Sequence, residues 1–151
     1  MAALADCAAW LRVVQYAAML LVVLARVMTA AGMVATLADA LVAVTGSVYP
    51  FFAPLVGALG GFVTGSGTSA NVLFGSLQTG AANALGVPAN LLAAANVMGA
   101  GIGKMICPQS IAIGTAAALI APRAGEAFKR AFPWFLAVLA LACLVCGLLA
   151  L

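Results

Sequence analysis

The chain has 151 residues, of which 67% are hydrophobic and only 6% are charged, and its mean hydropathy is +1.26. An ordinary soluble domain carries about 25% charged residues, so this chain cannot build the polar surface of a soluble fold and must be surrounded mostly by lipid. Histidine is absent and the net charge of +3 is scattered, which disfavours hydrolase chemistry, a metal site and a nucleic-acid face.

The first predicted span covers residues 11–31, an apolar run long enough to cross a bilayer core, which needs about 20 residues. Arg26 interrupts this run, and its side chain either reaches the membrane interface from near a helix end or faces an internal cavity. Residues 33–44 carry apolar side chains at helical spacing with Asp39 among them. This pattern predicts a short helix.

Residues 48–64 are hydrophobic but contain two prolines and three glycines. We therefore expect a broken or re-entrant segment here rather than a plain span. Gly57, Gly61 and Gly65 form two overlapping G-x-x-x-G motifs. On a helix such glycines form a smooth stripe that favours close packing against a neighbour.

A dense polar run, T-G-S-G-T-S-A-N, occupies residues 64–71 with hydrophobic sequence on both sides. Inside a bilayer such a run survives only where protein or a wet cavity surrounds it. Ser66, Thr68 or Ser69 can cap a helix over residues 69–86, and the partial positive charge at its N-terminus would attract an anion. The alternative is a connecting loop at the membrane surface.

Two further predicted segments cover residues 88–103 and 105–121, with Lys104 between them as the only charge from Gly86 to Ala121. If the two are short helices that meet inside the bilayer, Lys104 lies near the midplane, where a charge is costly and indicates a function. If they are two thin spans, Lys104 is an interfacial anchor. The preceding glycines, Pro108 and Gln109 favour the broken helix. A nucleotide P-loop is excluded by the residues around Gly103 and Lys104.

Residues 122–131 hold three of the six basic side chains, and the positive-inside rule predicts a cytoplasmic loop. Residues 132–151 then form a plain final span. Cys143 and Cys146 match a C-x-x-C motif, but they lie in this hydrophobic stretch without a βαβ pattern. We interpret all four cysteines as packing residues. The predicted fold is thus an all-α integral membrane protein with re-entrant or discontinuous helices and glycine-rich breaks.

Several stretches together resemble the carboxy-terminal portion of the L-lactate permease family, whose members also carry glycolate. The matching stretches are residues 25–28, 32–33, 62–66, 68–78, 94–96, 103–106 and 108–112. The resemblance implies a multi-pass secondary transporter in the bacterial inner membrane. It would move a small 2-hydroxy monocarboxylate with a proton or another cation, and it would need an N-terminal part that precedes this region. Many relatives have aspartate at Gly67, serine at Ala70 and serine at Cys107.

A site for lactate must hold a carboxylate and a hydroxyl, and transporters place such sites between discontinuous helices. Lys104 would supply the counter-charge. The candidate binding residues are Ser66, Thr68, Ser69, Asn71, Asn96, Lys104, Gln109 and Ser110. We expect no catalytic residues and no cofactor. The alternatives are a non-transporting membrane module that packs against a partner subunit, and an intramembrane enzyme, which the absent histidine and the lack of paired carboxylates disfavour.

Overall fold

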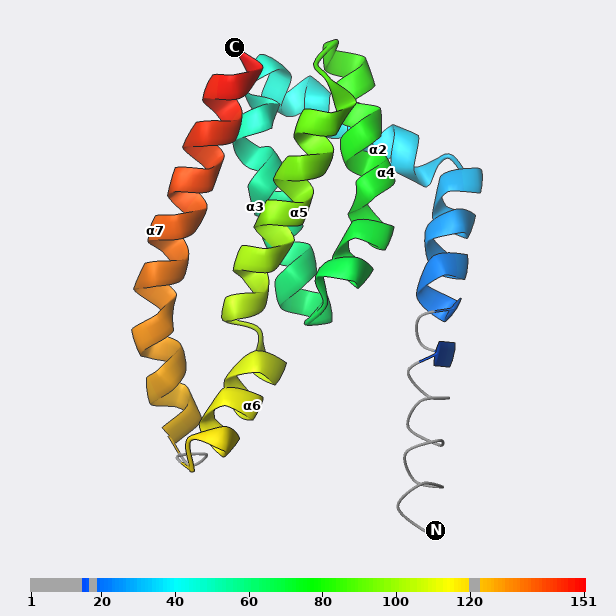
Figure 1. Ribbon diagram of the computed structural model, residues 1–151. Coiled ribbons are helices and arrows are strands. Elements are labelled where there is room, and N and C mark those ends of the chain that lie inside the picture. Colours follow the sequence, from blue (N-terminus) through cyan, green and yellow to red (C-terminus); the bar gives the residue numbers. More distant parts are fainter. Residues whose placement is uncertain (1–14, 17–18, 120–122) are drawn as a thin grey trace.

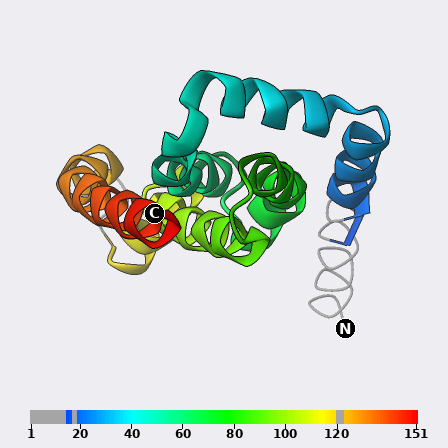
Figure 2. The ribbon, with the colours of Figure 1, turned by 90° about the horizontal axis from the view of Figure 1, so that it is seen from above.

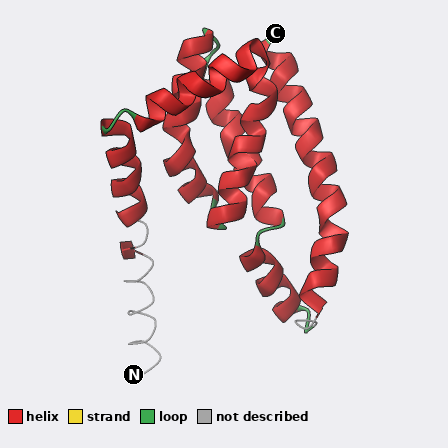
Figure 3. Ribbon diagram, turned by 180° about the vertical axis from the view of Figure 1, so that it is seen from behind, coloured by secondary structure: helices red, strands yellow, loops and turns green. Residues whose placement is uncertain are grey.

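The computed structural model describes residues 15–16, 19–119 and 123–151, and its regular structure within them is helical throughout (Figures 1 and 3). The elements in chain order are the helix Met19–Ala30, α2 (Met33–Thr45), the 3-10 turn η1 (Gly46–Val48), α3 (Tyr49–Thr64), α4 (Gly67–Leu85), α5 (Ala89–Met105), α6 (Pro108–Ala117) and α7 (Ala124–Ala150). Of the predicted first span, residues 11–14 and 17–18 lie outside the described residues, as does Cys7.

The all-α membrane fold is confirmed. By length and composition, Met33–Thr64 and Ala124–Ala150 can each cross a membrane. The pair α5 and α6, bent by 47° at a short break, can form a third span and is the expected discontinuous element. The outer face of α7 exposes large apolar side chains, as a lipid-facing helix requires; they include Trp134, Leu141, Leu144 and Leu148.

Helix α2 lies across the direction of its neighbours: seen from above, it is viewed lengthwise while α3 and α4 are viewed closer to end-on (Figure 2). Gly32, with φ +74°, allows the sharp turn before it. The turn η1 then leads into α3. The sequence predicted a broken or re-entrant segment over 48–64, but the structure has one continuous helix, α3, which passes through Pro54.

Helices α3 and α5 pack backbone against backbone through two glycine pairs. Gly57 and Gly61 of α3 lie against the carbonyls of Asn96 and Ala100, where any Cβ would overlap them. In return, two glycines of α5 lie against carbonyls of α3: Gly99 meets Pro54 and Gly103 meets Ala58. The close packing predicted for Gly57 and Gly61 is confirmed, and the glycines of α5 complete it.

The second half of the chain departs from the predicted boundaries. Residues 99–104 do not interrupt the helix, because their glycines pack against α3 and α5 continues to Met105. The break lies at Ile106 and Cys107, and α6 is shorter than the predicted 105–121. The prediction of a loop over 122–131 is also wrong for residues 124–131, which are helical. Helix α7 begins at Ala124 and includes the charged residues.

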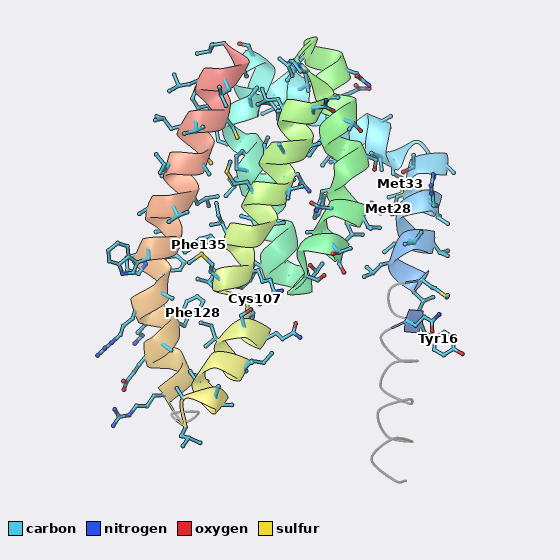
Figure 4. The ribbon with its side chains drawn as sticks, viewed as in Figure 1. Tyr16, Met28, Met33, Cys107, Phe128 and Phe135 are labelled. Atoms are coloured by element: carbon cyan, nitrogen blue, oxygen red, sulfur yellow. The ribbon has the colours of Figure 1, made fainter. Side chains whose placement is uncertain are left out.

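Two apolar clusters hold the helices together. The first joins α2, α3, α4 and α5, with a contribution from Cys146 of α7. The second joins α3, α5 and α7 around Phe135 and Leu139. Figure 4 shows Phe128 and Phe135 pointing from α7 toward α5 and α6. Helix α4 contacts α2, α3 and α5.

A cysteine at Gly125 tests the predicted cytoplasmic side of the α7 start. Gly125 is exposed and has open space around its Cα, so Gly125→Cys fits without strain. We expect an impermeant maleimide to label this variant only after cells are lysed, because the basic residues around it favour the cytoplasm. The parent chain gives the background labelling. Equal labelling of intact and lysed cells would contradict the orientation.

Candidate functional site

Two helix breaks meet in the structure. The first is the turn at Gly65 and Ser66, which joins α3 to α4 in an antiparallel hairpin. The second is the turn at Ile106 and Cys107 between α5 and α6 (Figure 4). The amide oxygen of Gln109 lies so close to Gly65 that a Cβ there would overlap it, and the same Cβ would lie 3.7 Å from Cys107 Sγ. We call this meeting of the two turns the break site.

The N-terminus of α4 opens at the break site. Ser66 has an extended backbone, its Oγ accepts a hydrogen bond from the N–H of Ser69 at 3.3 Å, and its carbonyl accepts from Ala70 at 3.0 Å. The Thr64 hydroxyl lies 2.9 Å from the same carbonyl and supports the turn. Within the described residues, the N–H groups of Gly67 and Thr68 have no partner. These two donors are therefore available to a ligand.

The N-terminus of α6 opens at the same place. Cys107 is its N-cap: Sγ accepts from the N–H of Ser110 at 3.3 Å, and the carbonyl accepts from Ile111 at 3.1 Å. Pro108 has no N–H to satisfy, and it is favoured at the first position of a helix. The N–H of Gln109 has no partner in the described part of the chain. The sulfur thus fills the capping position at the start of α6.

Replacing the capping sulfur tests this interpretation of Cys107. Cys107→Ala should lower stability by about 1 kcal/mol, because it leaves the N–H of Ser110 without an acceptor, whereas Cys107→Ser should retain the cap. Thermal unfolding in detergent measures both. Cys143→Ala is the matched control, since it removes the same atom from a cysteine that caps no helix. Equal melting temperatures for the alanine and serine variants would contradict the capping role.

Opposite helix ends meet at the break site. The N-termini of α4 and α6 carry partial positive charge, while the C-termini of α3 and α5 carry partial negative charge. Lys104 lies in the last turn of α5 with an exposed side chain. A partly buried anion could accept hydrogen bonds from the free N–H groups of both half-helices. This is the arrangement by which discontinuous helices bind charged ligands.

A chain of buried polar groups runs through the helices beside the break site. The Tyr49 hydroxyl donates to Gln78 Oε1 at 2.9 Å, and Gln78 Nε2 donates to the Ala53 carbonyl at 3.0 Å and to Asn96 Oδ1 at 3.4 Å. Asn96 Nδ2 then donates to Asn71 Oδ1 at 2.8 Å. Gln78 and Asn96 are 0% and 1% exposed. The chain connects α3, α4 and α5 through side chains of all three helices.

The predicted binding residues fall into three groups. Ser66, Ser69, Gln109 and Ser110 surround the two capped N-termini, and Asn71 and Asn96 bond to each other along the polar chain. Thr68 and Lys104 are exposed near the breaks. The prediction omitted Tyr49 and Gln78 from the site. Gln78 lies seven residues after Asn71, on the same face of α4, and that spacing was the available signal.

Arg26 lines a groove of about 290 Å³ between the helix Met19–Ala30 and α4. Thr29 and Ser76 also line this groove, and the Thr29 hydroxyl donates to the Ala25 carbonyl at 2.8 Å. Arg26 itself is exposed along this open groove, so a side chain at the membrane interface and one facing a cavity both stay predictions. This groove is separate from the break site, which Gly65 and Gln109 define.

A family model for L-lactate permease matches residues 1–151. The chain belongs to the L-lactate permease family. It is 45% identical over 121 residues to an L-lactate permease of Bacillus subtilis (strain 168), which covers 80% of this chain and 21% of the relative. It is 52% identical over 98 residues to a glycolate permease of Escherichia coli (strain K12), which covers 65% of this chain and 17% of the relative.

An L-lactate permease of Streptococcus iniae is 62% identical over 65 residues, which covers 43% of this chain and 14% of that relative. The chain therefore spans about a fifth, or less, of the length of these family members. No solved structure matches it. The family match makes this chain part of a transporter family rather than an enzyme family, and the apolar helices fit a membrane location.

Proposed function

We propose that this chain contributes the carboxy-terminal part of a secondary active transporter for a small 2-hydroxy monocarboxylate, L-lactate or glycolate, in the bacterial inner membrane. The observation that carries the proposal is the meeting of two capped helix N-termini at Gly65 and Gln109. The printed names of the relatives, L-lactate permease and glycolate permease, give the substrate class.

The substrate carboxylate would accept hydrogen bonds from the free N–H groups of Gly67, Thr68 and Gln109. Charge-assisted hydrogen bonds of this kind are stronger than neutral ones. Lys104 would balance the negative charge from the last turn of α5. The substrate hydroxyl would exchange hydrogen bonds with the hydroxyls of the capping segments, which are those of Ser66, Ser69 and Ser110. Asn71 would lie one turn deeper along α4.

We further propose that the transport is coupled to a proton. The support for proton coupling is the family membership. Among the described residues, the break site itself includes no carboxylate, since Asp39 lies on α2 and Glu126 on α7. The proton-carrying group would then belong to another part of the longer transporter. A protonophore should abolish uptake, whereas replacement of external sodium should leave it unchanged. Uptake that needs sodium would assign the coupling to another cation.

A chimaera tests the transport proposal. The matched 121-residue segment of the Bacillus subtilis permease would be replaced by that of this chain and expressed in cells without their own lactate and glycolate permeases. We expect saturable uptake of labelled L-lactate, with unlabelled glycolate as a competitor. A chimaera that reaches the membrane in normal amount but takes up no lactate would overturn the proposal.

Two glycine variants of the chimaera test the break site itself. Gly65→Ala should abolish uptake, because Gly65 has φ +65° and its new Cβ would overlap the Gln109 amide. Gly75→Ala is the matched control on the neighbouring helix, since nothing lies within 4 Å of its added Cβ, and it should transport normally. Normal uptake by Gly65→Ala would remove the break site from the mechanism.

The second candidate function is a membrane module that packs against a partner without transporting, and the broad apolar outer face of α7 favours it. Proteoliposomes that contain only this chain should take up no lactate under either candidate, because Thr68, Lys104 and Gln109 are exposed and no described helix closes the site over them. The chimaera separates the two candidates. Saturable uptake by the chain alone would contradict both.

A further inference from the structure

We infer that Gln78 is a positioning residue that fixes the direction of the buried amide chain, so that Asn71 presents hydrogen-bond donors to an anionic substrate. The inference rests on the proposed function, because it concerns the carboxylate bound beside Asn71. It gives Gln78 and Asn96 the role of orienting the Asn71 amide, which their burial alone does not indicate.

The carbonyl of Ala53 sets the direction of the first amide. A carbonyl oxygen only accepts hydrogen bonds, and it lies 3.0 Å from Gln78 Nε2. The Gln78 Oε1 atom therefore faces the Tyr49 hydroxyl, which donates to it at 2.9 Å. With the amide reversed, Oε1 would face the Ala53 oxygen and two acceptors would meet in a site with no exposed surface. Such an arrangement leaves buried polar groups unsatisfied and is strongly disfavoured.

The second amide follows from the first. The remaining hydrogen on Gln78 Nε2 points to Asn96 Oδ1 at 3.4 Å, so Asn96 Nδ2 faces the other way. It donates to Asn71 Oδ1 at 2.8 Å. Since Asn96 is only 1% exposed, no bulk water is available to support the reversed orientation. The Ala53 carbonyl thus fixes the orientation of the Gln78 amide, which fixes that of Asn96 and then that of Asn71.

Asn71 is the last residue of this chain of hydrogen-bonded amides, and its Oδ1 atom already accepts a hydrogen bond from Asn96. Its Nδ2 group has no partner among the described residues, and the side chain is half-buried. Asn71 lies four residues after Gly67, which is one turn along α4 from the free N–H groups of the break site. A donor amide at this place attracts a carboxylate, whereas an outward oxygen would repel it. The chain of amides from Gln78 to Asn71 therefore favours an anionic substrate at this place.

Reversing the last amide is the direct test, made in the chimaera described above. In Asn96→Asp the carboxylate still accepts from Gln78 but cannot donate to Asn71. Asn71 must then turn its NH2 group inward and its oxygen outward. We expect the KM for L-lactate to rise about tenfold or more while kcat changes little, because a hydrogen bond to a charged group is replaced by a repulsion. Gln78→Met removes the fixed direction without adding a charge and should raise KM as well.

A neutral analogue distinguishes positioning from a merely structural role. Lactamide has an amide in place of the carboxylate and can donate to an outward oxygen. It should compete poorly with lactate in the parent chimaera, and its competition relative to unlabelled lactate should improve in Asn96→Asp. Thr79→Val is the control on α4: it removes the hydroxyl that bonds to the Ser76 carbonyl and should change neither value.

The outcomes are distinguishable from failure of the transport proposal. If the parent chimaera takes up no lactate, the proposed function fails. If the parent transports, but Asn96→Asp and Gln78→Met reach the membrane with unchanged KM and an unchanged ratio of lactamide to lactate competition, then the amide direction does not matter and the inference is wrong. If Asn96→Asp fails to reach the membrane, Gln78→Met decides by the same two measurements.

Discussion

Replacing Gly103 by alanine will disrupt the packing of α3 against α5, whereas the same replacement at Gly101, two residues away on the same helix, will not. A Cβ at Gly103 would overlap the carbonyl of Ala58, and α3 cannot move away without losing the other three glycine contacts. Overpacking of this kind costs about 1–3 kcal/mol, and the upper end is expected where backbone is the obstacle. Gly101 has nothing within 4 Å, and alanine there raises helix propensity.

A thiol-reactive fluorescent dye measures this difference on the purified chain in detergent. Cys107 and Cys146 are buried, so they react only when the helices separate. We expect a much lower unfolding temperature for Gly103→Ala and an equal or slightly higher one for Gly101→Ala. If the two variants unfolded together, the close backbone packing of α3 and α5 would not determine stability.

Replacing Lys104 by glutamine will reduce lactate uptake sharply in the chimaera while the protein still reaches the membrane. Glutamine retains length and hydrogen bonding but removes the only charge near the break site between Gly86 and Ala121. Where the rest of the longer transporter covers the site and lowers its dielectric constant, a carboxylate loses substantial binding energy without its counter-charge. Lys104→Arg should restore uptake only in part, because the planar guanidinium presents its donors in a fixed fork.

The control for Lys104 is Lys129→Gln, which removes an exposed charge from α7 and should leave uptake unchanged. A charge that merely stabilises the C-terminal end of α5 would be replaced fully by arginine. Full activity of Lys104→Arg together with loss in Lys104→Gln would therefore indicate a helix-end role. Unchanged rate and affinity in Lys104→Gln would make Lys104 an interfacial anchor.

The sequence alone predicts the class of the fold and most of its helices, because apolar runs, prolines and capping residues are local signals. It places the second break too early. The glycines at 99 and 103 have the composition of a loop, and only the stripe on α3 shows that they belong inside a helix. The charged side chains after Arg123 are exposed in the structure. Exposure does not require a loop, and Glu126, Lys129 and Arg130 are good helix formers.

In the candidate site, too, features set by local sequence can be predicted, and features set by the packing of distant segments cannot. The capping role of Ser66 follows from its place before a helix, and it can be predicted from the sequence. The position of Gln109 against Gly65 cannot, because it depends on how the α3–α4 hairpin meets the α5–α6 break. The contact of Tyr49 with Gln78 joins residues 29 positions apart in sequence and needs the packed helices to form.

The glycine contacts between α3 and α5 also constrain how this region can move. Backbone carbonyl oxygens lie directly against the glycine Cα atoms, so no side chains between the two helices can change rotamer. Sliding one helix past the other would therefore bring several backbone atoms into overlap at once. With α4 bonded to both through Gln78 and Asn96, the three helices must move as one rigid body. In the proposed transporter, a change of access would then be confined to hinges, and the positive-φ glycines Gly32 and Gly46 and the joint at Cys107 are places where the backbone allows them.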